Sequence, residues 1–138
     1  MILVDTGPLV ALCDARDDRH AIALRQLRTL AAVDLAVCDA VVVEACFHLP
    51  HPSQRRRLRA LLQDLRIRPV SIQDEWAFRL DVFDWLLKYE EHEPDWADAC
   101  LAVLSGRDKT AKVWTYDREF RTTWRRPGGT AIPLAVRF

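Results

Sequence analysis

Residues 1–10 read MILVDTGPLV, and the predicted fold depends on this stretch. Four apolar residues indicate a short buried strand that ends at the carboxylate of Asp5. Pro8 suits the first turn of a helix, so the chain is expected to turn sharply from a strand into a helix. Asp5 has two interpretations at this point. It either accepts backbone N–H bonds in the turn or holds a ligand at the end of a sheet.

Strands and helices are predicted to alternate along the whole chain. The expected strands cover residues 1–4, 33–39, 67–72, 111–117 and 130–136, and the expected helices cover residues 7–18, 19–32, 40–49, 53–65, 74–92, 95–106 and 118–124. Asp39 is expected to be the N-cap of the third helix. The alternation predicts an α/β fold with helices on both faces of a central, mostly parallel sheet, and ligands at the carboxyl ends of its strands.

The composition predicts one folded domain over residues 1–138. Half of the residues are hydrophobic, 29% are charged and the net charge is zero, which does not indicate a strongly basic nucleic-acid binder. No C-x-x-C pair occurs, so the cysteines are expected to be reduced and buried; they are Cys13, Cys38, Cys46 and Cys100. With no signal-peptide pattern and no apolar run long enough for a membrane, a cytoplasmic protein is expected.

Four acidic residues stand in apolar surroundings, where an ionised carboxylate is costly unless it is paired, hydrogen-bonded or bound to a metal. They are Asp5, Glu44, Asp98 and Asp117. Each also has a structural interpretation. Glu44 could pair with an arginine, and Asp117 could cap the turn that follows it. Asp98 could form an approximate capping box with Asp95 at the start of a helix.

Short connections in a parallel sheet would bring these four carboxylates to one crevice. Together they would repel one another and raise their pKa values. A hard divalent cation removes that cost, and oxygen ligands without a cysteine or histidine cluster favour Mg²⁺ or Mn²⁺ over zinc. Such a site supports metal-assisted hydrolysis, in which the ion activates a water and stabilises charge on a phosphate. The patterns of serine hydrolases, P-loop proteins and dinucleotide-binding proteins are absent.

Four motifs, in this order, resemble the PIN domain, in particular the VapC-type ribonuclease toxins of bacterial and archaeal toxin–antitoxin pairs. They are VDTGPLVAL at residues 4–12, the isolated Glu44, DWADACLAVL at residues 95–104 and WTYDREF at residues 114–120. The resemblance assigns the catalytic, metal-binding acids to Asp5, Glu44, Asp98 and Asp117. It assigns supporting positions to Thr6, Asp95 and Thr115.

The resemblance also implies a PIN-like three-layer α/β/α sandwich, Mg²⁺- or Mn²⁺-dependent cleavage of RNA, homodimerisation and a cognate antitoxin that blocks the site. An RNA-processing nuclease without a toxin role would use the same site. A Mg²⁺-binding module without catalysis is a further alternative. A small antitoxin gene directly upstream would favour the toxin.

Two further groups of residues have open interpretations. The basic residues after Asp117 could contact RNA phosphates or form only a solvated surface; they are Arg118, Arg121, Arg125 and Arg126. A row of apolar side chains repeats at helical spacing within residues 74–92 and is expected to make core or dimer contacts; its members are Trp76, Leu80, Phe83 and Leu87.

Overall fold

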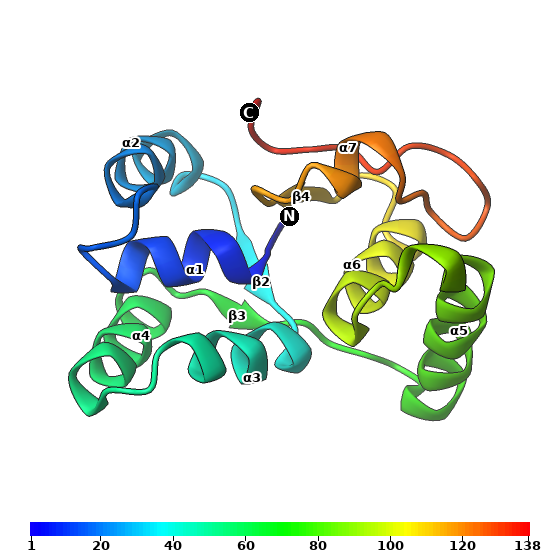
Figure 1. Ribbon diagram of the computed structural model, residues 1–138, viewed down its shortest axis with the longest axis horizontal. Helices are drawn as coiled ribbons and strands as arrows, with labels where there is room; N and C mark the ends of the chain where they lie inside the picture. The colour runs from blue at the N-terminus through cyan, green and yellow to red at the C-terminus, as the bar shows by residue number, and fades with distance from the viewer.

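Four short parallel strands form the sheet of the computed structural model, which describes residues 1–138 (Figure 1). The strands are β1 (Ile2–Val4), β2 (Leu35–Val37), β3 (Arg68–Pro69) and β4 (Lys112–Trp114). They lie in the order β3-β2-β1-β4, with Leu3 beside Ala36 on one side and beside Val113 on the other. The predicted parallel sheet is confirmed, and every strand pair in it is parallel.

Helices make the connections between the strands and flank the sheet. They are α1 (Thr6–Cys13), α2 (His20–Leu30), α3 (Asp39–His48), α4 (Pro52–Asp64), α5 (Glu75–Lys88), the 3-10 helix η1 (Glu90–His92), α6 (Trp96–Arg107) and α7 (Glu119–Thr122). Figure 1 shows α1 to α4 gathered on one side of the strands and α5 with α6 on the other. The predicted α/β alternation is confirmed. None of the helices has the length and apolarity that crossing a bilayer requires.

The chain changes direction across the sheet between β1 and β4. From β1 it moves outward to β2 and β3, and α5 and α6 then bring it back to β4, on the other side of β1. Because such connections are right-handed, the outward and returning helices cover opposite faces. In open parallel sheets the ligand crevice lies outside the carboxyl ends of the strands where the direction reverses. Here those strands are β1 and β4.

Helix α6 is buried on nearly all sides, since residue 97 and residues 99–105 are all shielded from solvent. It packs on α5, α3 and β4. Small side chains such as Ala99 and Ala102 let its neighbours approach closely. A helix buried all round is apolar all round, so the charge of Asp98 in its first turn is unusual.

The prediction that the cysteines are buried holds for three of the four. Cys13, Cys38 and Cys100 are buried and Cys46 is half-buried, and none forms a disulfide. They fill space in the hydrophobic core beside larger side chains such as Trp114.

The predicted strand over residues 130–136 is wrong. This segment makes only isolated bridges, between Val113 and Leu134 and between Arg125 and Ala131. It runs along the free edge of β4, where Val113 N–H donates to the Pro133 carbonyl at 2.8 Å. Pro133 has no N–H of its own to donate, so the regular pattern of a strand cannot continue through it.

Two predicted helix boundaries are also wrong. Cys38, not Asp39, is the N-cap of α3, and no side chain caps that helix; Asp39 lies in its first turn. The first helix ends at Cys13, although it was expected to reach Asp18. Asp14 and Asp17 follow it, and their carboxylates accept backbone N–H bonds two residues ahead, which favours turns over a continuing helix.

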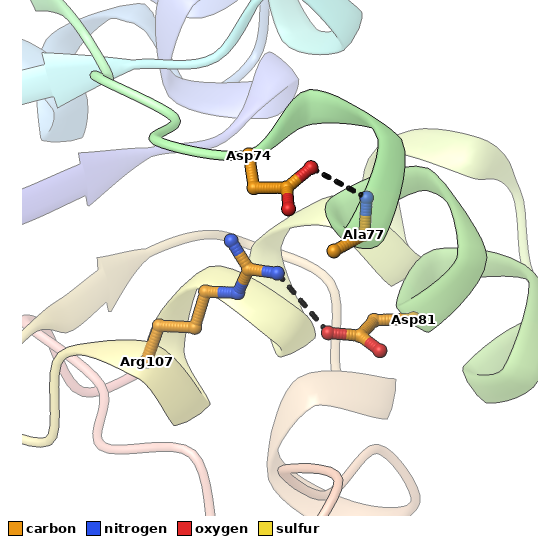
Figure 2. A network of polar contacts seen from close by, with 4 residues as sticks. All are labelled: Asp74, Ala77, Asp81 and Arg107. Carbon is orange, nitrogen blue, oxygen red and sulfur yellow. Dashed lines mark hydrogen bonds and ion pairs between the residues drawn. The ribbon is translucent and has the colours of Figure 1, made fainter.

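The N-cap of α5 offers a test of local stability. Asp74 Oδ1 accepts a hydrogen bond from Ala77 N–H at 3.0 Å, as Figure 2 shows. We expect Asp74→Ala to lower the free energy of unfolding by about 1 kcal/mol, because the helix loses a partner for one of its free N–H groups. Urea denaturation would measure this, with Asp18→Ala as the control at an exposed acid that forms no hydrogen bond. An equal loss in both variants would contradict the capping role.

Candidate active site

The acids predicted from the sequence converge on one pocket. Asp5 directly follows β1, and Asp117 lies beyond β4, at the two strand ends where the sheet changes direction. Glu44 comes from α3 and Asp98 from the first turn of α6. The pocket has a volume of about 360 Å³, and its lining includes these four residues together with Thr6 and Asp95.

Asp5 is the buried centre of this arrangement, with 7% of its surface exposed. Its Oδ1 accepts the Thr6 N–H at 2.7 Å, and its Oδ2 accepts the hydroxyl of Thr115, also at 2.7 Å. The Thr115 hydroxyl in turn accepts Asp117 N–H at 3.0 Å, so its own hydrogen points at Asp5. Thr115 therefore ties the end of β4 to the end of β1 and orients the Asp5 carboxylate.

Glu44 is held by Thr6. The Thr6 hydroxyl donates to Glu44 Oε2 at 3.1 Å, while the Thr6 backbone bonds to Asp5. The interpretation that Glu44 pairs with an arginine is wrong. The ion pairs of the structure join Arg68 to Asp34, Arg79 to Glu75 and Arg107 to Asp81, and none of them involves a residue of the pocket.

Asp95 and Asp98 form a capping box at the start of α6. Asp98 N–H donates to Asp95 Oδ1 at 2.8 Å, and Asp95 N–H donates to Asp98 Oδ2 at 3.2 Å. Asp117 likewise accepts Glu119 N–H at 2.9 Å. The capping interpretations of these residues are therefore correct, but they leave the second oxygens of Asp98 and Asp117 without a protein donor. A capping role and a ligand role are compatible for both.

The carboxylates of the pocket are poorly compensated by positive charge. Six of them line it, against one arginine and one histidine; the acids are Asp5, Asp17, Glu44, Asp95, Asp98 and Asp117. Burial raises the pKa of Asp5 from 3.8 to about 6, despite the hydrogen bonds from Thr115 and Thr6. Burial and then the charge of Asp95 raise the pKa of Asp98 to about 8 and also raise that of Glu44. Such crowding favours a bound cation.

The residues present fit a hard divalent cation by their chemistry. Their donors are carboxylate and hydroxyl oxygens, which suit Mg²⁺ or Mn²⁺. No group of three acidic, histidine or cysteine side chains is arranged closely enough to hold a metal ion in the structure. Coordination would therefore need side-chain rotation, for which the half-buried Glu44 has room.

Arg19 is a residue of the pocket that the sequence did not indicate. Its guanidinium lies 5.0 Å from the centre of the Tyr116 ring and donates to the Tyr116 carbonyl at 3.4 Å. It lies directly before α2, in the connection from α1, and no motif marks it as a site residue. His48 and Asp17 reach the same pocket from α3 and from that connection.

The four arginines predicted to bind RNA do not line this pocket. Arg121 donates to the Phe138 carbonyl at 2.6 Å and lies over its ring, and Arg125 donates to the Trp124 carbonyl. Arg126 is buried at the far end of α6. Arg118 is the one of the four whose side chain is exposed and forms no hydrogen bond or ion pair. Their position in the sequence, directly after Asp117, did not predict their position in space.

Comparison with protein families matches the PIN domain over residues 2–124, so the chain belongs to the PIN-domain family. PIN domains are typically nucleases that use a divalent metal. The crystal structure of VapC20 from Mycobacterium tuberculosis, a sarcin–ricin loop cleaving toxin, is similar with a TM-score of 0.69. The match covers 88% of this chain and 94% of that chain at 21% identity, which shows a shared fold. Comparison with curated proteins found no significant match.

The raised pKa values predict how metal-free protein responds to pH. Because Asp5 and Asp98 hold protons more tightly in the folded state, their contribution to stability is complete near pH 4 and is lost as the pH rises through about 6 and about 8. We therefore expect the Tm in EDTA to fall from about pH 5 to pH 9. The fall should be smaller in Asp98→Asn, which keeps the capping acceptor without the charge.

At neutral pH the same variant should have the higher Tm, by about 3–5 °C for each kcal/mol of repulsion that is relieved. Calorimetric melting of both proteins in EDTA would measure the two effects. A sharp drop in the Tm of Asp98→Asn would instead show that the acid is needed only for the helix.

Proposed function

We propose that this protein is a Mg²⁺- or Mn²⁺-dependent endoribonuclease that hydrolyses RNA phosphodiester bonds. The observation that carries the proposal is the convergence of Asp5, Glu44, Asp98 and Asp117 on one pocket of a PIN fold, with no cation paired to any of them. The fold alone would support many chemistries. Among these chemistries, the unpaired acids favour reactions that need a bound cation.

In this proposal Asp5, Asp98, Asp117 and Glu44 hold the metal. When bound, the ion supplies a Lewis acid that activates water and offsets charge on the phosphate. Thr115 and Thr6 keep the Asp5 carboxylate ionised and oriented, and Thr6 also positions Glu44. Asp95 keeps the start of α6, and so Asp98, in place. Arg19 supplies the guanidinium of the pocket, which could bind a phosphate of the RNA substrate.

We further propose that the nuclease is the toxin of a cytoplasmic toxin–antitoxin pair and forms a single PIN-like domain over residues 1–138. The similar structure of VapC20, a toxin that cleaves the sarcin–ricin loop, supports this choice. The cognate antitoxin would neutralise the acidic pocket. Exposed Arg118 remains a candidate contact for RNA outside the pocket.

Cleavage assays on labelled RNAs, including one that contains the sarcin–ricin loop, test the enzymatic proposal. We expect cleavage with Mn²⁺ or Mg²⁺ and none in EDTA. Loss of a residue that only orients a ligand typically costs about 10–100-fold, so Thr115→Val should lose that much and Asp98→Asn more. Asp64→Asn, an exposed acid at the end of α4, is the matched control.

Metal-dependent cleavage that persists in Asp98→Asn would contradict the assigned site. Binding of Mn²⁺ in calorimetry without cleavage of any RNA would favour a metal-binding module. Growth arrest on expression, reversed by the upstream gene, would separate a toxin from an RNA-processing nuclease.

We propose that the protein is a homodimer and that α5 contributes to the interface. The apolar row on α5 is not core, since its side chains are half or more exposed; they are Trp76, Leu80, Phe83 and Leu87. Phe83 also stacks edge-on against Trp96 at 5.0 Å, which extends the row onto α6. A continuous exposed apolar surface of this kind is uncommon on monomers.

Phe83→Asp should therefore convert the dimer into a monomer, because a charge in the centre of the row would be desolvated by association. Light scattering after size exclusion would measure the mass, with Val33→Asp as a control at an exposed apolar residue outside α5. Monomeric wild-type protein, or a dimer that survives Phe83→Asp, would contradict this interface.

A further inference from the structure

A second pocket lies at the opposite end of α6 from the acidic pocket. It has a volume of about 560 Å³ and is formed by the C-terminal ends of α5 and α6 together with residues 126–130. Lys88, Arg107, Lys109 and Arg126 line it, and we call it the basic pocket. Gly106 on its wall is eight residues along α6 from Asp98, or about 12 Å of helix rise. The two pockets are therefore separate sites.

Arg126 is the distinctive residue of the basic pocket. It is 8% exposed, yet it forms no ion pair. Its Nε donates to the Ser105 hydroxyl at 2.9 Å and its Nη2 donates to the Lys109 carbonyl at 3.0 Å, and both acceptors are neutral. Its Nη1 has no hydrogen-bond partner in the protein and is partly accessible to solvent. A buried charge without a counter-ion is costly, so an anionic partner would stabilise it.

The charges around Arg126 do not supply that partner. Asp81 is engaged by Arg107 at 3.1 Å, as Figure 2 shows. Asp84 is then the one remaining negative charge of the pocket. Three positive charges remain without an ion pair, on Lys88, Lys109 and Arg126. The basic pocket therefore keeps a net positive charge, opposite in sign to the acidic pocket.

The wall of the basic pocket is shaped by glycines. A Cβ on Gly106 would lie 2.9 Å from Pro127 Cδ, so residues 126–130 pack directly on the end of α6. Gly129 has φ +90°, a conformation that suits glycine, and its N–H bonds back to the Arg126 carbonyl at 2.7 Å. Gly128 faces open space. The loop is thus held in a tight turn beside Arg126.

We propose that the basic pocket binds a phosphate group carried by a nucleotide or by an RNA strand. A guanidinium fixed by two hydrogen bonds presents its remaining amine in a defined direction, and flanking lysines add charge without a strict geometry. The volume accommodates a phosphate with its attached sugar. The proposal does not depend on the nuclease activity, because it uses none of the residues of the acidic pocket.

A purely structural role for Arg126 makes a different prediction. A cation at the C-terminal end of α6 would be stabilised by the helix dipole and by its bonds to Ser105 and Lys109, with no ligand. In that case the side chains of Lys88 and Lys109 would be unimportant. Both are exposed and form no ion pair, so they can be changed without disturbing the packing.

NMR titration of ¹⁵N-labelled protein in EDTA tests the proposal. Inorganic phosphate, 5′-AMP and a short 5′-hydroxyl oligoribonucleotide are each added at constant ionic strength, with sodium chloride as the reference. We expect saturable shifts of the Gly128 amide and the Arg126 Nε–H. Binding should weaken by about fivefold in Lys88→Gln and in Lys109→Gln, through loss of one charge-assisted contact each. It should be unchanged in Lys112→Gln, an exposed lysine of β4 outside the pocket.

The ligands distinguish the source of the phosphate. Tighter binding of the oligoribonucleotide than of 5′-AMP would support a backbone phosphate of RNA, and equal binding would support a free nucleotide. Absence of saturable shifts, the same shifts with chloride, or equal weakening in Lys112→Gln would overturn the proposal. Failure here would leave metal-dependent cleavage at the acidic pocket unaffected.

Discussion

The hydrogen bond between Thr115 and Asp5 is the contact on which the site depends. It joins the carboxyl ends of β1 and β4 at 2.7 Å and places a carboxylate where the sheet changes direction. A buried carboxylate at that place is tolerated only with such donors, and even with them its pKa is raised. Glu44 and Asp98 approach Asp5 because α3 packs on α1 and α6, and α6 packs on β4.

Helix α6 connects the two charged regions of the molecule. Its N-terminal turn carries Asp98 beside Asp95, and its C-terminal end carries Arg107 and lies near Arg126. Both placements agree with the helix dipole, which favours anions at the N-terminus and cations at the C-terminus. The burial of the helix between them keeps these charges apart. A chain with zero net charge can therefore present one acidic and one basic pocket.

Much of the fold could be predicted because its signals are local. Apolar runs and helical spacing located β1, β2, β4 and the main helices. Asp95 was recognisable from the sequence as the N-cap of α6. Predictions failed where a local preference was overruled. Residues 130–136 look like a strand, but Pro133 interrupts the hydrogen-bonding pattern there. Asp39 is a good capping residue, but the backbone at Cys38 already has the extended conformation of the cap.

The sequence by itself determined the α/β fold and the identity of the isolated acids, because a lone carboxylate in an apolar segment is visible without coordinates. Only the tertiary structure decided which charges meet. Arg19 joined the acidic pocket from a connection with no motif, and Arg126 lay at the other end of α6, although it is close to Asp117 in the chain. The physical reason is that the energy between two charges depends on their distance in space. Folding can bring residues together that are far apart in the sequence, and can move apart residues that are close in it.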